Sequence, residues 1–352
     1  MRVAVLGAGG IACGTAVLLC REGHDPVIWS PSGRSTRAFA EGAPLVASGA
    51  ISGEFRPRIA TSCEEAMDGA DCVIFALPAQ GHRAVMDMAA KYATAAQTMI
   101  VSSQYSLGAL YLKMALDRRG VAAPVVAWGT TMVTGAMLSE TEVRVLSVRS
   151  SVDMATLPAT HSAAGMAVCR TLFGDRFHAR SNLIAIQLTN INPQAHLGNG
   201  LCNLTRIENG ESWNVFSGIT PTVGRLIEAL DLERLAVARA FGVEVRTMAE
   251  HMSLSYDLPI VPLAEATREI SLRGGIAAPT SLNTRWILED FPFGIVPTVE
   301  LARIAGVEVP LHQAGLALFT ALVGRDLAAE NDLLPSLALE QSTVDSLTLL
   351  AS

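Results

Sequence analysis

The stretch VAVLGAGGIACGTAVLL, from Val3 to Leu19, decides the fold of the N-terminal half of this chain. A short apolar run is followed by three glycines within four residues and then by a sequence compatible with a helix. This order of strand, glycine turn and helix fits the pattern G-x-G-x-x-G/A. It predicts that a dinucleotide binds at the turn, which consists of Gly7, Ala8, Gly9, Gly10, Ile11 and Ala12. A glycine-rich turn in an unrelated α/β protein is the alternative.

Each position in the turn has a physical reason. The first glycine makes the tight turn, and the second lets the backbone approach a pyrophosphate. Ala12 occupies the third small position, where a helix must pack closely against a strand. The N-terminus of the helix then faces the phosphates.

Strands and helices alternate on both sides of this motif. Apolar strands are expected at 3–6, 26–29, 72–77, 98–102 and 124–128, with helices such as 13–22 and 84–92 between them. The alternation predicts a doubly wound parallel sheet. We expect the segments 143–148, 153–158 and 177–179, with a helix at 163–172, to extend that sheet.

The pattern changes to helices alone from Asn182 onward. The longest helical period, TPTVGRLIEALDLERLAVARAFG, ends at Gly242, a residue type that often terminates helices. Further helices are expected at 262–272, 298–306 and 312–324, and strand signals are nearly absent. The predicted fold is therefore an α/β Rossmann domain, 1–182, followed by an all-α domain, 183–352.

Composition excludes several classes of protein. The chain is 50% hydrophobic, but its longest uncharged run, 120–139, is interrupted by proline and glycine and reads as two buried strands joined by a turn. The glycines near the N-terminus do not fit a signal peptide. A net charge of −7 without a basic tract argues against nucleic acid as a partner. The six scattered cysteines indicate a cytoplasmic protein with reduced thiols, and no metal site is predicted.

The residues after the second and third strands bear on the cofactor. An NAD site usually has an acidic residue after the second strand, but this chain has Ser30, followed by Ser32, Arg34 and Arg37. Hydroxyl and guanidinium groups suit a 2′-phosphate, so NADP is preferred and NAD is the second choice, unless this is merely a basic, solvated turn. After the third strand, Leu77, Pro78 and Ala79 are expected beside the nicotinamide. His82, at the start of the next helix, is expected on the surface.

A polar stripe in LTNINPQAHLGNGLCN, 188–203, marks the start of the second domain. On one helix, Thr189, Asn192, His196, Asn199 and Asn203 would share a face. Pro193 either kinks that helix or starts it with Asn192 as N-cap, in which case only the last three keep the spacing. Histidine suits proton transfer near neutral pH, but a core histidine satisfied by asparagines is equally compatible with the pattern.

A second candidate constellation lies in LNTRWILEDFPFG, 282–294. Arg285 could bind a substrate carboxylate through two hydrogen bonds, and Asp290 could orient an imidazole. An ordinary Arg–Asp surface pair is the alternative, and the residues alone do not choose.

These motifs together resemble the opine dehydrogenase family of the octopine and nopaline type, above all the bacterial N-(1-carboxyethyl)-norvaline-type dehydrogenases. The matching segments run almost from end to end: GAGGIA, PAQGH, LTNINPQAH, GITPTVGRLIEALDLERLAVARAFG and NTRWILEDFPFG. The resemblance implies a Rossmann domain followed by a helical domain. It also implies reversible reductive condensation of an α-keto acid with the amino group of an amino acid, giving a secondary amine dicarboxylate.

The resemblance also implies roles for residues. His196 would be the general acid/base, Asp290 would orient it, and Arg285 would bind the keto acid carboxylate. Asn192 and Gln104 are weaker candidates for substrate binding. The expected partners are small-molecule substrates, with no nucleic acid and no membrane, and the apolar composition permits a homodimer.

Two departures from the family pattern qualify these expectations. Ser30 replaces the usual acid, and WGTTMVTGAML, 128–138, lacks the glutamate that octopine-forming relatives carry, which predicts a smaller or less basic amino donor. A ketopantoate-reductase-like enzyme is one alternative, but such enzymes rely on a lysine in the helical domain, and Lys91 and Lys113 are the only lysines here. A non-catalytic NADP sensor is another, although it would not need the histidine, aspartate and arginine.

Overall fold

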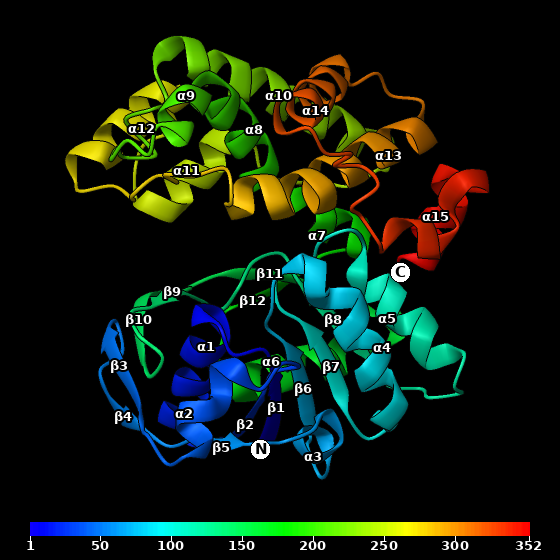
Figure 1. Cartoon of the computed structure of the whole chain (residues 1–352). Helices are drawn as coiled ribbons and strands as arrows, with labels where there is room; N and C mark the ends of the chain where they lie inside the picture. Colours follow the sequence, from blue (N-terminus) through cyan, green and yellow to red (C-terminus); the bar gives the residue numbers. More distant parts are fainter. The chain divides into compact units, whose positions relative to one another are not determined.

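The computed structural model describes all residues, 1–352, and they form two compact units (Figure 1). The first contains 1–187 and 349–352, and the second contains 188–348. The division falls inside helix α7 (Leu183–Thr189), whereas the predicted domain boundary follows residue 182. The division into compact units does not test the predicted domain boundary, which stays a prediction.

An eight-stranded sheet forms the centre of the first unit. Its order is β12-β11-β8-β7-β6-β1-β2-β5. The bounds are β1 (Arg2–Leu6), β2 (Asp25–Trp29), β5 (Arg58–Ile59), β6 (Cys72–Phe75), β7 (Thr98–Val101), β8 (Val125–Trp128), β11 (Val152–Leu157) and β12 (Phe177–Ala179). β6, β7 and β8 are buried along their whole length, as expected for strands of a sheet covered on both faces. The predicted doubly wound fold is confirmed.

The strand order changes direction at β1. The chain moves from β1 to β2 on one side and then returns to β6 on the other side of β1. Ligands of doubly wound sheets bind at this kind of switch point, beyond the carboxyl ends of the strands. The segments that follow β1 and β6 therefore lie where a dinucleotide is expected.

Helices and short 3₁₀ turns connect these strands. The helices are α1 (Gly10–Arg21), α2 (Arg37–Ala40), α3 (Cys63–Met67), α4 (His82–Tyr92), α5 (Gly108–Asp117) and α6 (Ser162–Phe173). The 3₁₀ turns are η1 (Arg34–Thr36), η2 (Ala79–Gly81) and η3 (Ala159–His161).

A second, four-stranded sheet was not expected. Its order is β4-β3-β10-β9, with β3 (Leu45–Gly49), β4 (Gly53–Phe55), β9 (Val133–Met137) and β10 (Glu142–Val148). The prediction that 143–148 extends the main sheet was wrong, because β10 pairs with β3 and β9. The prediction was right for β11 and β12. The run 120–139 does hold two strands, but only β8 is fully buried, and β9 belongs to this second sheet.

The small sheet packs against α1. A Cβ atom on Gly10 would lie 2.6 Å from the Cα atom of Ala136 in β9, closer than real Cβ contacts. Gly14, one turn further along α1, meets the Val133 side chain. Glycine at these positions lets the backbones of α1 and β9 approach closely, so the helix that begins at the glycine turn is held between the two sheets.

The second unit is helical, as predicted. It contains α8 (Asn192–Cys202), α9 (Leu204–Glu208), α10 (Pro221–Ala240), α11 (Met248–Tyr256), α12 (Leu263–Leu272), the π-helix η4 (Trp286–Ile295), α13 (Val296–Ala305) and α14 (Pro310–Val323), then η5 (Leu334–Leu337), η6 (Leu339–Gln341) and most of α15 (Val344–Leu350). A single isolated β-bridge joins Asn214 and Ala277. Gly242 follows α10 in the left-handed conformation, as its predicted stop requires. None of the helices could span a membrane.

Candidate active site

Helix α8 carries the histidine of the polar stripe. Of the two alternatives for Pro193, the continuous helix with a kink was wrong, because α7 ends at Thr189 and α8 begins at Asn192 with Pro193 in its first turn. Pro193 therefore starts a helix and does not kink one. Ile191 is the N-cap, so the alternative that gave Asn192 this position was also wrong in that detail. The Asn192 backbone amide donates to the Asn190 side-chain oxygen, at 3.1 Å.

The two asparagines after the histidine bind a loop of the same unit. Asn199 Nδ2 donates to the carbonyl of Val215 at 3.0 Å. Asn203 Nδ2 donates to Asn199 Oδ1 at 2.9 Å and to the Gly218 carbonyl at 3.2 Å. Both side chains are buried. They hold the segment 215–218 against α8, so neither amide is the partner of the histidine.

His196 pairs with a carboxylate from η4. His196 Nδ1 lies 2.7 Å from Asp290 Oδ2, and the side chains are 15% and 0% exposed. A carboxylate accepts, so Nδ1 carries the hydrogen and Nε2 is left to exchange a proton. Nε2 makes no hydrogen bond within the protein, and it is not fully buried. The dyad thus has one fixed nitrogen and one accessible nitrogen.

The unusual helix η4 presents this carboxylate. It runs for ten residues as a π-helix, a rare form that is frequent at functional sites. Asp290 is fully buried within it. Arg285, just before η4, pairs with Glu289 at 3.2 Å, and its side chain is 56% exposed. Because Asp290 is fully buried, the alternative of an Arg–Asp pair on the surface was wrong.

Two weaker substrate candidates lie in different surroundings. The Asn192 side chain is half-buried and makes no hydrogen bond within the protein. Gln104 is buried, and its amide is occupied at both ends: Nε2 donates to the Leu183 carbonyl at 3.2 Å, and Oε1 accepts from the Ala109 amide at 3.3 Å. Gln104 therefore connects the loop after β7 to the start of α7.

The glycine turn fits a pyrophosphate. Gly7 has φ +133, and a Cβ atom there would lie 2.2 Å from the carbonyl oxygen of Ala76. Gly9, the N-cap of α1, is exposed, with no heavy atom within 4 Å of a Cβ position and no side chain capping the helix. The first amides of α1 therefore lack side-chain acceptors and suit an anion. Ala12 is fully buried, as the third position requires.

The residues after β2 form a basic edge. Ser30 is half-buried, and Ser32 lies in the exposed turn that follows. Arg34 begins η1 and Arg37 begins α2, and both side chains are exposed and form no ion pair. Unpaired guanidinium groups at this position suit an anionic group such as a 2′-phosphate.

The segment after β6 is anchored by a buried histidine. Leu77 is half-buried, Pro78 is exposed and Ala79 is buried. His82 was expected on the surface, which was wrong: it is 1% exposed, and its Nε2 donates to the Leu77 carbonyl at 3.0 Å. Burial lowers the pKa of His82 to about 4. A neutral imidazole therefore fixes this loop.

Two protein-family models match successive parts of the chain, one over the α/β part and one mainly over the helical part. Residues 3–158 match the model of ketopantoate reductase PanE/ApbA. Residues 179–323 match the model of NAD/NADP octopine/nopaline dehydrogenase, alpha-helical domain. An opine dehydrogenase from Arthrobacter sp. (strain 1C) is 30% identical over 346 residues, which are 97% of this chain and 96% of that protein.

The chain belongs to the opine dehydrogenase family.

Solved structures agree in fold. Octopine dehydrogenase, determined with NADH and agmatine, L-arginine or pyruvate, has TM-scores of 0.81–0.82 at 17–18% identity, covering 99% of this chain and 98% of that one. Yersinopine dehydrogenase with NADP⁺ bound has a TM-score of 0.71 at 16% identity, covering 99% of this chain and 97% of that one. As a member of the opine dehydrogenase family, the protein is an NAD(P)-dependent oxidoreductase, and the match to ketopantoate reductase is confined to its N-terminal half.

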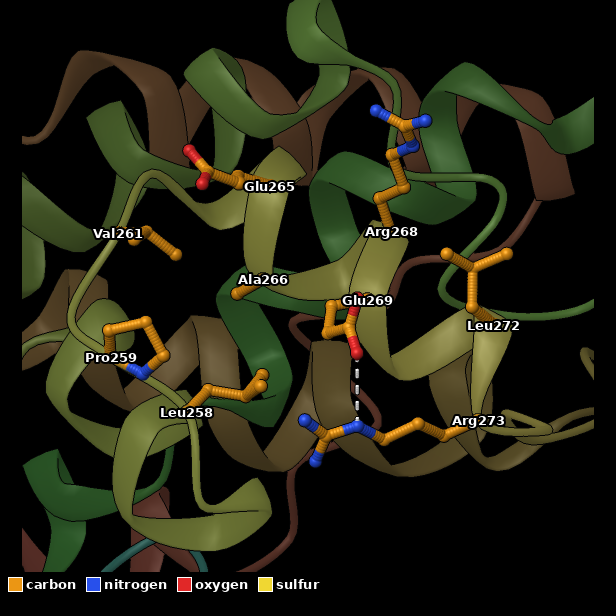
Figure 2. A pocket seen from close by; sticks show the side chains of 9 residues that line it. All are labelled: Leu258, Pro259, Val261, Glu265, Ala266, Arg268, Glu269, Leu272 and Arg273. Carbon is orange, nitrogen blue, oxygen red and sulfur yellow. Dashed lines mark hydrogen bonds and ion pairs between the residues drawn. The ribbon is translucent and has the colours of Figure 1, made fainter.

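Two hollows in the helical unit contain none of the predicted site residues. One, of about 480 Å³, lies along α12. Figure 2 shows its lining, in which Glu269 and Arg273 form an ion pair at 3.2 Å. The other, of about 560 Å³, is lined by α13, α14 and the segment 328–340. Neither is lined by a histidine or by a serine or cysteine nucleophile.

Sequence reasoning missed two residues near the dyad. Glu289 accepts the ion pair from Arg285, and Trp286 lies against the dyad. The sequence patterns assigned a role to neither residue. Their spacing from Arg285 and Asp290 was the available signal, because residues four apart share a helical face.

Proposed function

We propose that this opine dehydrogenase condenses a pyruvate-like α-keto acid with the amino group of an amino acid and reduces the product. The observation that carries the proposal is the contact of His196 Nδ1 with buried Asp290, in a chain that also has an open glycine turn at the start of α1. The octopine dehydrogenase structures that share this fold contain NADH with pyruvate or L-arginine, which supports the same classes of ligand here.

The proposed reaction has three steps. The amine adds to the keto carbon, the resulting carbinolamine loses water, and the imine takes up a hydride and becomes a secondary amine. The net equation is keto acid, amino acid, NAD(P)H and one proton giving the secondary amine dicarboxylate, NAD(P)⁺ and water. A bound nicotinamide supplies the hydride.

His196 handles the protons in this scheme. Its protonated form donates from Nε2 to the departing hydroxyl group, and its neutral form takes a proton in the reverse reaction. Asp290 keeps the Nδ1 hydrogen in place and stabilises the imidazolium by charge. A carboxylate without solvent exposure cannot be screened by water, so this stabilisation is stronger than on a surface.

Arg285 is the proposed ligand of the keto acid carboxylate. Its guanidinium is more than half exposed and already lies 3.2 Å from Glu289, so a substrate carboxylate would share or replace that contact. The free side chain of Asn192 is proposed to assist on the substrate side. For Gln104 to bind substrate, one of its two main-chain hydrogen bonds would have to be exchanged.

NADP is the proposed preferred cofactor, with NAD as the second. The support is Ser30 in place of a carboxylate, with Arg34 and Arg37 exposed and unpaired. The relatives in this fold include one solved with NADH and one with NADP⁺, so the family accepts both. The amino donor is proposed to be smaller or less basic than arginine, because 128–138 offers no counter-charge.

The protein is proposed to act in the cytoplasm and to form a homodimer. All six cysteines are free, which suits a reducing compartment. The dimer is supported by α14, which has no Asp, Glu, Lys or Arg and leaves Leu318 and Leu322 about half exposed, at 48% and 49%. Light scattering on the purified protein would test the dimer, and a single mass equal to that of the monomer would refute it.

A substrate panel tests the activity. The protein is incubated with NADPH or NADH, pyruvate and single amino acids, while absorbance and product mass are followed. Amine-dependent oxidation with a product of the condensed mass is expected, faster with neutral donors than with arginine. No amine-dependent oxidation with any common keto acid would overturn the proposal.

A further inference from the structure

The imidazole of His196 is held on two sides by one helix. Asp290 binds Nδ1, and the indole of Trp286 lies flat on one face of the ring, with centroids 4.4 Å apart and planes inclined by 12°. Both partners come from η4, four residues apart, so they share a face of that helix. What remains free of η4 is Nε2 and the opposite face of the ring.

The position of Trp286 is itself well determined. Its ring is 6% exposed and meets Trp213 edge to face, at 6.3 Å and 89°. Gly200, one turn after His196 in α8, lies beside it: a Cβ there would be 3.5 Å from the indole, which is an ordinary van der Waals contact. The indole therefore lies across α8 at His196 and Gly200 and cannot rotate freely.

Charged groups near the ring pair come from several elements. On α10 and α14, Glu233 pairs with His312 at 2.7 Å, and His312 Nε2 lies 3.1 Å from Gln194 Nε2 of α8. From η4, Asp290 faces Nδ1, and the Glu289–Arg285 pair lies on the neighbouring positions. From α9, Arg206 lies 4.8 Å above the Trp213 ring and pairs with Glu211, so its charge is separated from His196 by two indoles. Asp290 is the charged group that hydrogen-bonds and pairs with the imidazole.

We infer that Trp286 is a positioning residue of the dyad, which holds the imidazole in the plane that aims Nε2 outward and stabilises its charged form. Two physical effects carry this. A flat stack removes rotation about the histidine side-chain torsions, and small misplacements of a catalytic group are costly in rate. A cation over the face of an indole is attracted by its quadrupole, so the stack favours imidazolium over neutral imidazole. The catalytic consequence rests on the proposed function, whereas the effect on protonation does not.

The first test is a titration that needs no substrate. The imidazole resonances of the wild type and of Trp286→Leu are followed by NMR against pH, and His196 is assigned with a His196→Asn variant. The midpoint for His196 is expected to fall by about 0.4–0.7 pH unit when the indole is removed. Trp286→Phe keeps a ring and should restore most of the difference. Trp128→Leu, which removes another buried indole, in the first unit, is the control and should leave the midpoint unchanged.

The second test is kinetic. In the direction of amine formation, Trp286→Leu is expected to lower kcat about 10- to 100-fold while the Kd of NADPH stays unchanged. The alkaline fall of the kcat/KM profile, which reports the free enzyme, should move to lower pH by the same amount as the NMR midpoint, since the protonated dyad is the proton donor. Trp286→Met, with a longer and more flexible side chain and no ring, replaces the leucine variant if that variant does not fold.

The two proposals fail in different ways. A wild-type protein that is inactive with every substrate would overturn the proposed function, and the titration would still decide the role of Trp286. An active wild type whose Trp286→Leu and Trp286→Met variants keep the His196 midpoint and kcat would overturn the positioning role alone. A loss of melting temperature with an unchanged midpoint would likewise reduce Trp286 to a core residue.

Discussion

Replacing Asp290 with asparagine removes the charge of the dyad while keeping the size of the side chain. In the wild type, Asp290 is fully buried and its Oδ2 accepts from His196 Nδ1 at 2.7 Å. A hydrogen bond to a charged group contributes about 1.5–3 kcal/mol. If that amount is lost from the imidazolium, the midpoint of the kcat profile falls by about 1–2 pH units, at about 1.36 kcal/mol per unit. The same loss in the transition state slows the reaction about 10- to 150-fold.

The assay is the pH dependence of kcat and kcat/KM for amine formation, with the Kd of NADPH measured separately by fluorescence. The cofactor constant should not change, because the residues predicted to bind it are in the other unit. Asp231→Asn is a matched control: Asp231 is another buried carboxylate, paired with Arg234 at 2.7 Å. That variant should lose thermal stability without moving the pH profile. A folded Asp290→Asn enzyme with wild-type kcat and an unshifted profile would refute the assignment of the dyad.

Three further predictions concern the N-terminal unit. Gly9→Ala should leave the melting temperature nearly unchanged but weaken NADPH binding tenfold or more. Gly7→Ala should destabilise the fold, because a Cβ at position 7 would lie 2.2 Å from a backbone oxygen. Equal effects of the two variants on stability would contradict this interpretation of the turn. Arg34→Ala should raise the Kd of NADPH about five- to tenfold more than that of NADH, and the exposed Arg21→Ala is its control. His82 has a pKa lowered to about 4, below its unfolded value, so its neutral form stabilises the fold above about pH 6.5 and this contribution is lost as pH falls towards 4. His82→Gln should therefore flatten the fall in unfolding free energy between pH 7 and 4.5 by up to about 3 kcal/mol, measured by urea titration, and an unchanged slope would contradict the buried, neutral histidine.

The parts of the fold that local sequence determines were predicted correctly. The strand, turn and helix at Gly7–Ala12 follow from backbone requirements of single positions, such as the positive φ at Gly7. The buried strands of the main sheet are short continuous apolar runs. The second sheet could not be read in this way. β3 and β4 are short and partly exposed, and the partner of β10 is β3, almost a hundred residues earlier, which no local pattern specifies.

The candidate site likewise has residues that the sequence identified and others that it did not. The residues of the dyad were candidates from the sequence, but their pairing was implied only by the family resemblance, because a separation of 94 residues carries no periodicity. Its neighbour Trp286 was missed, since an aromatic residue within an apolar run is more often core than site. His82 was expected at the surface because a helix start is usually exposed. Its hydrogen bond to the Leu77 carbonyl depends on how the preceding loop turns, which only the folded backbone defines.

The polar residues of α8 do not all act directly on the dyad. Asn199 and Asn203 do not contact the dyad, but they hold the carbonyls of Val215 and Gly218. A Cβ on Gly218 would lie 2.3 Å from the Trp213 ring, so a loop fixed at this glycine lets Trp213 approach closely. Trp213 in turn meets Trp286, which stacks on His196. The asparagines that sequence reasoning weighed as direct partners of the histidine therefore support it from a distance, through a loop and two indoles. This chain of contacts explains why one helix carries both the proposed acid/base and the amides: the same face that presents His196 also fixes the loop that keeps its ring in plane.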